Sequence, residues 1–269
     1  MKVLHIWNQA GTASLISNEL NARGIYSAVL QDKKHDSLGI SKYYNDVTYT
    51  KIPFLLHSLS ASRLYDIIHL HDSYFMILPL KILYPGKKII MHYHGSLVRN
   101  NTLGKKRLFL EKYVNKIIVS TPDLLKYNYQ KPPELVYDMI DQELFKPKPR
   151  PLNGRAFSCL KWTQTDQSLR NKLITSGFSF HLETQNRNAR LIPYVDFPNF
   201  LNQFEFYIDM PIINNKIVYA NSCAGLQAMS LGLKVISNDG IIRSTLPNHH
   251  KPNQVMKQLT EIYKKMVKG

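Results

Sequence analysis

The chain has 269 residues, 44% hydrophobic and 11% aromatic, so it is expected to fold around one large core or two small ones. Its 35 basic and 19 acidic residues give a net charge of +16, which predicts attraction to nucleotide diphosphates or anionic lipid headgroups. A general adaptation to solubility is the alternative. The dispersed basic residues, without zinc-finger spacing or an RNA-binding aromatic signature, argue against nucleic acid as a partner.

The sequence indicates an intracellular protein. No segment approaches 18 uninterrupted apolar residues, and the N-terminal apolar run is too short for a signal peptide. Cys159 and Cys223 lie far apart in apolar surroundings, as expected for reduced thiols. We therefore predict a cytoplasmic location.

Short apolar runs alternate with segments of helical period through the first 140 residues. The predicted strands are 2–7, 26–31, 66–71, 88–94, 116–121 and 134–137, and the predicted helices are 12–23, 74–84 and 105–114. Strands that are apolar in the middle and separated by helices indicate a parallel sheet covered on both faces.

A proline-rich segment interrupts this pattern. Three prolines within residues 147–151 predict a linker. Beyond it, the predicted strands are 156–160, 178–182, 206–210 and 233–237, and residues 253–267 form an amphipathic helix. We predict two α/β domains, residues 1–146 and 147–250, followed by a terminal helical segment, 251–269.

The loop after the first predicted strand is a candidate ligand-binding segment, because ligands of open parallel sheets bind outside the carboxyl ends of the strands. Gly11 permits a tight turn there, and Thr12 or Ser14 can cap the following helix. The loop lacks G-x-G-x-x-G and the P-loop signature, which disfavours a dehydrogenase or an NTPase.

Two predicted strands end in H-x-H pairs, His69/His71 and His92/His94. Residues two apart in a strand point to the same face, so each pair is a candidate pair of metal ligands. Histidines that cap strand ends are the alternative for His69 and His92. The chain is short for a (β/α)8 barrel that would complete such a shell, so we predict no metal. Gly95 lets the backbone turn away and leaves the His94 imidazole facing the crevice.

Residues 221–236, NSCAGLQAMSLGLKVI, predict a helix that leads directly into a buried strand. Gly232 stands where the helix is expected to stop. Small residues at its start, including Ser222 and Gly225, can present backbone N–H groups to a phosphate.

Four stretches, in this order, resemble motifs of the retaining GT-B glycosyltransferases of glycosyltransferase family 4. They are YDIIHLHDSYFMILPLKILYPGKKIIMHYHG (65–95), KIIVSTPDLLKY (116–127), PELVYDMIDQELFKPKP (133–149) and QAMSLGLKVI (227–236). The resemblance implies two Rossmann-like domains facing across a cleft. The first lies on the acceptor side, and the second, shortened and divergent, binds the donor.

This resemblance implies transfer of a sugar from a UDP- or GDP-sugar to an acceptor, with retention at the anomeric carbon. It implies no cofactor and no metal, since basic side chains and helix N-termini neutralise the leaving diphosphate. His94, near the reacting centre, and Lys161, near the diphosphate, are the implied catalytic residues. The implied binding residues are Gly11, Thr12, His71, Gly95, Ser222, Gly225, Gln227 and Tyr219.

The chain departs from the family in three ways. The second domain is shorter than the family's, and only Lys161, with Arg155 or Arg170 as less favoured alternatives, stands where the family places an Arg and a Lys that grip the diphosphate. The third departure concerns two carboxylates. Tyr219 and Gln227 stand where the family carries carboxylates, and a glutamine amide bonds a ribose hydroxyl more weakly than a carboxylate does. A GT-B-derived binding or partner protein without turnover is therefore the main alternative. A metal-dependent hydrolase that uses the H-x-H pairs is less favoured.

The terminal amphipathic helix carries lysines on its polar side. It is compatible with peripheral contact at the inner face of a membrane and with a lipid-linked or cell-surface glycan as acceptor. We favour a helix that packs back on the first domain, because its apolar residues include no Trp or Phe anchor.

Overall fold

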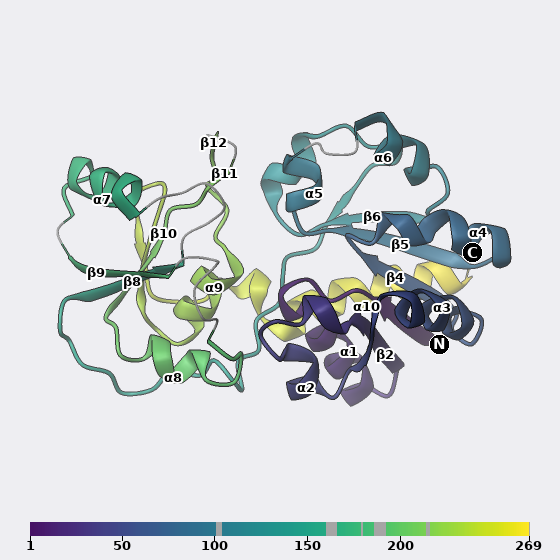
Figure 1. Cartoon of the computed structure of the whole chain (residues 1–269), viewed down its shortest axis with the longest axis horizontal. Helices are drawn as coiled ribbons and strands as arrows, with labels where there is room; N and C mark the ends of the chain where they lie inside the picture. Colours follow the sequence, from purple (N-terminus) through teal and green to yellow (C-terminus); the bar gives the residue numbers. More distant parts are fainter. Residues whose placement is uncertain (101–103, 160–165, 179, 186–191, 214–215, 269) are drawn as a thin grey trace. The chain divides into compact units, whose positions relative to one another are not determined.

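The computed structural model describes residues 1–268 except 101–103, 160–165, 179, 186–191 and 214–215 (Figure 1). The chain divides into two compact units, Met1–Met139 with Pro252–Gly269, and Ile140–Lys251. The first unit is therefore discontinuous in sequence, and residue 146, where the sequence predicts the boundary, lies within the second. Among the described residues, no helix is long and apolar enough to cross a membrane.

A seven-stranded parallel sheet, in the order β3-β2-β1-β4-β5-β6-β7, forms the centre of the first unit. Its strands are β1 (Lys2–Ile6), β2 (Tyr26–Asp32), β3 (Val47–Tyr49), β4 (Ile67–His71), β5 (Lys88–Tyr93), β6 (Lys116–Val119) and β7 (Glu134–Leu135). The direction of winding reverses between β1 and β4. This is the topological switch point, where sheets of this kind bind ligands.

Helices cover both faces of this sheet. They are α1 (Thr12–Ala22), α2 (Ile40–Tyr44), α3 (Lys51–Ser62), α4 (Ile77–Leu83), α5 (Ser96–Arg99), α6 (Gly104–Glu111) and α10 (Pro252–Lys268), with 3-10 turns η1 (Gln9–Gly11), η2 (Lys33–His35), η3 (Tyr74–Met76) and η4 (Pro122–Lys126). The sequence predicts α1, α4, α6 and α10 but not α2, α3, α5 or β3. In α3, Pro53 and three serines hide the helical pattern, although proline is compatible with a first helical turn.

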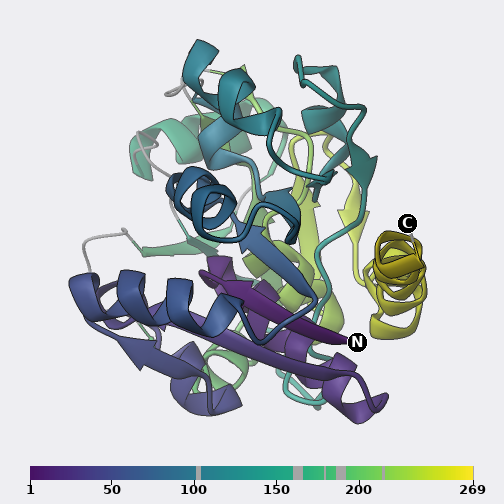
Figure 2. The same ribbon diagram turned by 90° about the vertical axis from the view of Figure 1, so that its right-hand side faces the viewer.

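α1 and α10 cover one face of the sheet together, and Figure 2 shows α10 in yellow, nearly end-on. The sheet contributes fully buried branched side chains to this face, among them Ile67, Ile90 and Ile118. The apolar face of α10 packs on them with five side chains that are at most 5% exposed: Val255, Met256, Leu259, Ile262 and Tyr263. Burial of a large apolar side chain contributes about 1.5–3 kcal/mol, so α10 is an integral part of this core.

α3 and α4 cover the opposite face, where Phe54, Ile77 and Leu80 pack against the other set of alternating strand residues. At the edge of this core, the buried Arg107 on α6 donates to Glu111 Oε1 at 2.5 Å and to the carbonyl of Asn128 at 2.6 Å. Glu111 also accepts from the hydroxyl of Tyr93, at 2.9 Å, so a closed ionic network ties α6 to β5.

The second unit is built on a five-stranded sheet in the order β14-β13-β10-β8-β9. Its elements are β8 (Arg155–Cys159), α7 (Asp166–Thr175), β9 (His181–Gln185), α8 (Phe197–Leu201), β10 (Phe206–Asp209), β11 (Ile212–Ile213), β12 (Lys216–Ile217), α9 (Cys223–Ser230), β13 (Lys234–Ser237), β14 (Ile242–Arg243) and η5 (Asn248–His250). Only β14 runs antiparallel to its neighbour in this sheet. The switch point lies between β8 and β10.

One strand of this unit lies later in the sequence than predicted. The apolar run at 178–182 predicts a strand, but β9 is His181–Gln185, three residues further on. Phe178 and Phe180 instead pack beside the core as part of the connection that follows Gly177. Their apolar character therefore reflects burial in a loop.

The proline-rich segment, residues 147–151, comes shortly after Phe145, whose side chain and backbone are both anchored in the second unit. The ring of Phe145 is fully buried 5.5 Å from that of Tyr194, and its carbonyl accepts from Ser230 Oγ at 2.7 Å. The chain enters the second unit at Ile140 and leaves it after Lys251. The backbone N–H of Ile140 donates to the carbonyl of His250 at 3.2 Å, so a hydrogen bond joins the two ends of this unit. The two crossings therefore lie side by side.

Candidate functional site

Five histidines lie on one face of the first sheet, toward the carboxyl ends of β1, β4 and β5. We call His5, His69, His71, His92 and His94 the histidine cluster. The strand register places His5 beside His69 and His71 beside His92, and neighbouring ring centroids are 4.2–5.4 Å apart. His94 projects beyond the end of β5 but has a side chain only 5% exposed, and the other four histidines are at most 1% exposed. The cluster adjoins the topological switch point.

Three of these imidazoles form a hydrogen-bonded chain that ends on a carboxylate. His94 Nδ1 lies 3.0 Å from Asp138 Oδ1, His94 Nε2 lies 3.0 Å from His71 Nδ1, and His71 Nε2 lies 2.9 Å from His5 Nδ1. The hydroxyl of Thr12, at the start of α1, donates to the same Asp138 oxygen at 3.4 Å. The structure thus brings together three predicted site residues, His71, His94 and Thr12.

The pKa shifts of the three hydrogen-bonded histidines differ in direction. Burial alone lowers the pKa of His94, but the nearby Asp138 and Asp72 carboxylates outweigh it and raise the pKa above the usual value. Burial lowers the pKa of His5 to about 3 and that of His71 well below its ordinary value. The carboxylates therefore favour the protonated form of the imidazole at the sheet edge, whereas burial favours the neutral form of the imidazoles beneath it.

The backbone after His94 requires glycine. Gly95 has φ of +115°, and a Cβ atom there would lie 2.0 Å from the guanidinium of Arg99. Arg99 is fixed by two hydrogen bonds to the carboxylate of Asp123, at 2.8 and 2.9 Å. The loop is therefore built around a partly buried ion pair that brings a cation close to the predicted site residue Gly95.

The loop after β1 is ordered by a side chain that sequence reasoning overlooked. α1 begins at Thr12, so Thr12 and Ser14 lie within its first turn and neither acts as the cap. Asn8 Oδ1 accepts from the backbone N–H of Ser14 at 3.3 Å instead, and the hydroxyl of Ser14 donates to Asp46. Gly11, with φ of +85°, makes the turn that the sequence predicts.

In the second unit, a carboxylate occupies part of the helix start that we expected to bind phosphate. Ser222 caps α9 by accepting from the N–H of Gly225 at 3.1 Å, and its own N–H donates to Asp209 Oδ2 at 2.7 Å. Of the other predicted residues, Gln227 is buried and Tyr219 is 66% exposed. Lys161 lies outside the described residues.

Replacing Gly225 with alanine is expected to displace Asp209 from the start of α9, because the added Cβ would lie 2.1 Å from Oδ2 and 2.6 Å from Cγ. We expect the free energy of unfolding to fall by about 1–3 kcal/mol in urea denaturation. Gly86→Ala is the control, since a Cβ there meets nothing within 4 Å. Equal stability of the two variants would show that Asp209 does not need this space.

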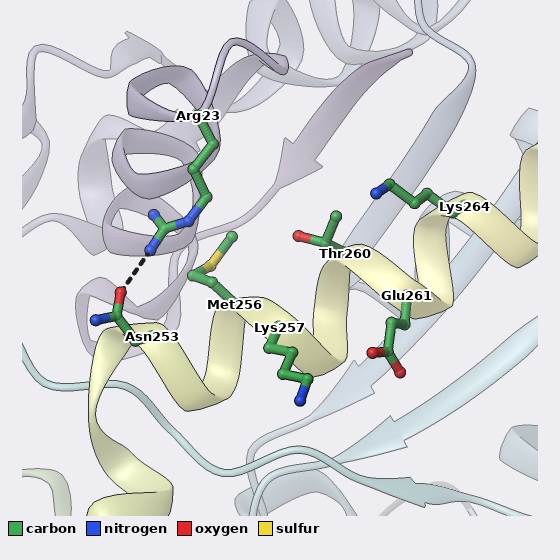
Figure 3. A pocket seen from close by; sticks show the side chains of 7 residues that line it. All are labelled: Arg23, Asn253, Met256, Lys257, Thr260, Glu261 and Lys264. Atoms are coloured by element: carbon green, nitrogen blue, oxygen red, sulfur yellow. Dashed lines mark hydrogen bonds between the residues drawn. The ribbon is translucent and has the colours of Figure 1, made fainter.

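A separate hollow of about 300 Å³ lies between the end of α1 and the polar side of α10 (Figure 3). Arg23 Nη2 donates to Asn253 Oδ1 at 3.0 Å across it, and Lys257 and Lys264 line it together with Glu261. α1 runs from the carboxyl edge of the sheet to its amino edge, so this hollow lies away from the histidine cluster.

No known protein-family profile matches the chain, and no curated protein matches it by sequence. Its structure is similar to sucrose-phosphate synthase from Thermosynechococcus elongatus, with a TM-score of 0.61, 11% identity and 99% of each chain covered. It is similar to an alpha-glucosyltransferase in complex with UDP-glucose and DNA containing an abasic site (TM-score 0.56, 11% identity, 99% of this chain and 90% of that one). It is also similar to UDP-GlcNAc 2-epimerase from Methanocaldococcus jannaschii, with a TM-score of 0.53, 10% identity, and 98% of this chain and 100% of that one covered.

At these identities the likeness concerns the fold alone. It confirms the predicted α/β class with two Rossmann-like domains of the GT-B type. Three carboxylates at the sheet edges, Asp72, Asp138 and Asp209, were missed as site residues. Asp72 directly follows β4, Asp209 is the last residue of β10, and Asp138 stands three residues after β7; this position near strand ends is the signal that could have found them.

Proposed function

We propose that the chain is a glycosyltransferase that moves a sugar from a nucleotide-diphosphate sugar to an acceptor, with retention of anomeric configuration. The observation that carries the proposal is the convergence of His94, Asp138 and Thr12 at the switch point of a GT-B-type chain. The fold neighbour that holds UDP-glucose supports a nucleotide-sugar donor, UDP- or GDP-linked. Membership of glycosyltransferase family 4 is part of the proposal.

In this proposal the first unit contributes charge and position to the transfer. The raised pKa of His94 favours an imidazolium, and Asp138 fixes its orientation through Nδ1. Both ring nitrogens of His94 already have partners, so it acts on the reacting centre chiefly through its positive charge, unless a substrate hydroxyl displaces His71. Thr12 and the Gly11 and Gly95 backbones line the same edge.

The donor is assigned to the second unit. Lys161 grips the diphosphate in this proposal, with Ser222 and Gly225 at the start of α9, and Gln227 and Tyr219 contact the nucleotide sugar. No cofactor takes part, and the diphosphate is neutralised by protein groups without a metal ion.

A second candidate is a binding or partner protein that has lost turnover. The carboxylate of Asp209 at the start of α9 favours it, since it repels the phosphate that this helix start would otherwise attract. The neutral side chains of Tyr219 and Gln227 favour it as well. A metal-dependent hydrolase built on the H-x-H pairs is a weaker alternative.

We place the protein in the cytoplasm, with a lipid-linked or cell-surface glycan as acceptor. The apolar face of α10 is buried in the first unit, so peripheral contact with the inner face of a membrane would be electrostatic, through exposed lysines such as Lys264 and Lys265. Such contact weakens at high salt, which flotation with anionic vesicles measures.

The test is calorimetric titration with a panel of UDP- and GDP-sugars, followed by a transfer and hydrolysis assay. We expect one donor to bind, and His94→Ala to lower kcat by about 100-fold or more, the usual cost of removing one charge-stabilising group. His57→Ala, an exposed histidine on α3, is the matched control and should keep full activity.

The outcomes separate the candidates. Binding of a donor without turnover over a broad acceptor panel supports the second candidate and rejects the enzyme. Full activity in His94→Ala removes His94 from the catalytic group. Failure of every nucleotide sugar to bind rejects the enzyme and, of the second candidate, leaves only a partner protein that has lost the donor as well.

A further inference from the structure

The ring nitrogens of His71, His92 and His94 form a compact group. One nitrogen from each lies within 4.8 Å of the others. Zinc holds imidazole nitrogens at about 2.0–2.1 Å, so two tetrahedral ligands lie roughly 3.3 Å apart. His71 Nδ1 and His94 Nε2 are 3.0 Å apart, close to that spacing before any adjustment.

His92 gives an independent indication that this group takes a ligand. It is 1% exposed, and within the described part of the chain neither of its ring nitrogens has a hydrogen-bond partner. A buried polar group without a partner costs about 1–3 kcal/mol. The hydrogen-bonded chain through His5, His71 and His94 leaves His92 unexplained, whereas a cation shared with His71 and His94 explains it.

The surroundings of His94 match those of metal-bound histidines. A ligating imidazole usually donates its other ring N–H to a carboxylate or carbonyl, which fixes the ring and strengthens the ligand. Asp138 Oδ1 lies 3.0 Å from His94 Nδ1 and leaves Nε2 directed at the group. The carboxylate also offsets part of the charge that a divalent cation brings into a buried site.

A second set of ring nitrogens, from His5, His69 and His71, also lies within 4.8 Å of one another, but this set is deeper in the protein. It shares His71 with the first set, so the two sets compete for this ligand. His5 and His69 are fully buried below the sheet edge, whereas Asp138 beside His94 has a side chain 18% exposed, which gives an ion access from solvent. These observations favour the set at the edge.

We propose that His71, His92 and His94 bind one divalent transition-metal ion of the zinc class. Three imidazoles form a borderline-soft ligand set that suits such ions better than Mg²⁺ or Ca²⁺. The ion joins the carboxyl ends of β4 and β5, beside the switch point between β1 and β4, and its three protein ligands leave a fourth tetrahedral position open. The inference rests on the three imidazoles and not on the proposed sugar transfer, but it changes the role of one residue. A metal-bound His94 is not an imidazolium, so the positive charge that the proposed function assigns to His94 would be supplied by the ion.

The test uses the full chain purified without a polyhistidine tag. Metal content is measured by elemental analysis, and the chelator-treated protein is then titrated with Zn²⁺ by competition calorimetry and with Co²⁺ by visible spectroscopy. We expect one ion per chain, a visible Co²⁺ band of low-coordinate geometry, and a Tm that rises with Zn²⁺ concentration.

Three variants make the test specific. His92→Phe keeps the bulk of the ring and should lose stoichiometric binding while its circular dichroism stays that of the wild type. Asp138→Asn should bind about 10–100-fold more weakly. His181→Ala, an exposed histidine at the start of β9, should bind like the wild type.

Wild-type protein that takes up no stoichiometric Zn²⁺ or Co²⁺ overturns the proposal. Stoichiometric metal binding that persists in His92→Phe overturns it as well. So does a loss of binding in His181→Ala as large as the loss in His92→Phe. Donor titrations on the metal-free protein are read separately, so failure of the metal site and failure of the proposed function are distinguishable.

Discussion

Removal of residues 252–269 is expected to unfold the first unit. α10 buries five large side chains against α1 and the sheet, at about 1.5–3 kcal/mol each, or roughly 7–15 kcal/mol together. A whole domain is stable by only about 5–15 kcal/mol, so this loss matches its entire stability. We expect the truncated chain to lose the circular dichroism of the first unit and to be cleaved rapidly by protease within residues 1–139.

A point variant refines this prediction where the truncated chain is insoluble. Leu259 is fully buried, so Leu259→Ala should lower the free energy of unfolding by about 2–5 kcal/mol. The matched control is Lys264→Ala with Lys265→Ala, on the exposed side of the same helix, which should change stability by at most about 0.5 kcal/mol. A truncated chain with the Tm of the full chain would show that α10 is dispensable.

Arg107→Ala is expected to lower the free energy of unfolding by about 3–5 kcal/mol, because it leaves the Glu111 carboxylate buried without its partner. Glu111 would keep only its bonds from Tyr93 and the backbone of Gln130. Urea denaturation followed by circular dichroism gives the value. Arg63→Ala, at an exposed arginine after α3, is the control.

A double variant tests the cause of that loss. Arg107→Met combined with Glu111→Leu removes both charges, so it should cost less than Arg107→Ala alone. A double variant that is less stable than the single one would assign the loss to side-chain packing, since Arg107 also stacks 4.9 Å from the ring of Tyr129.

The fold could largely be predicted from the sequence, because a strand buried on both faces of a parallel sheet consists of a short run of apolar residues, and such runs alternate here with segments of helical period. The errors have local causes. Pro53 and the serines of α3 obscure its helical period, and the run from Phe178 is apolar because it packs in a loop. Arg107 belongs to a basic run that looks like a surface cluster, but its partner Glu111 makes burial possible.

The candidate site could be predicted only in part. The H-x-H spacing places pairs of histidines on one face, since that follows from the strand period alone. Their partners depend on tertiary structure. Asp138 is 44 residues from His94, and Tyr263, whose hydroxyl lies 2.7 Å from His69 Nδ1, is 194 residues away. The bond from Ser222 to Asp209, 13 residues earlier, is likewise set by the strand–helix crossover.

The discontinuity of the first unit has a consequence for biosynthesis. Residues 252–268 leave the ribosome only after the whole of Ile140–Lys251, a delay on the order of ten seconds at ordinary translation rates. During that interval the second unit can fold, whereas one side of the first sheet is covered by α1 but still lacks α10. The nascent chain then exposes the apolar residues that α10 later buries, together with His69, whose ring Tyr263 contacts in the complete fold. That interval is when the chain is most open to chaperones and to aggregation.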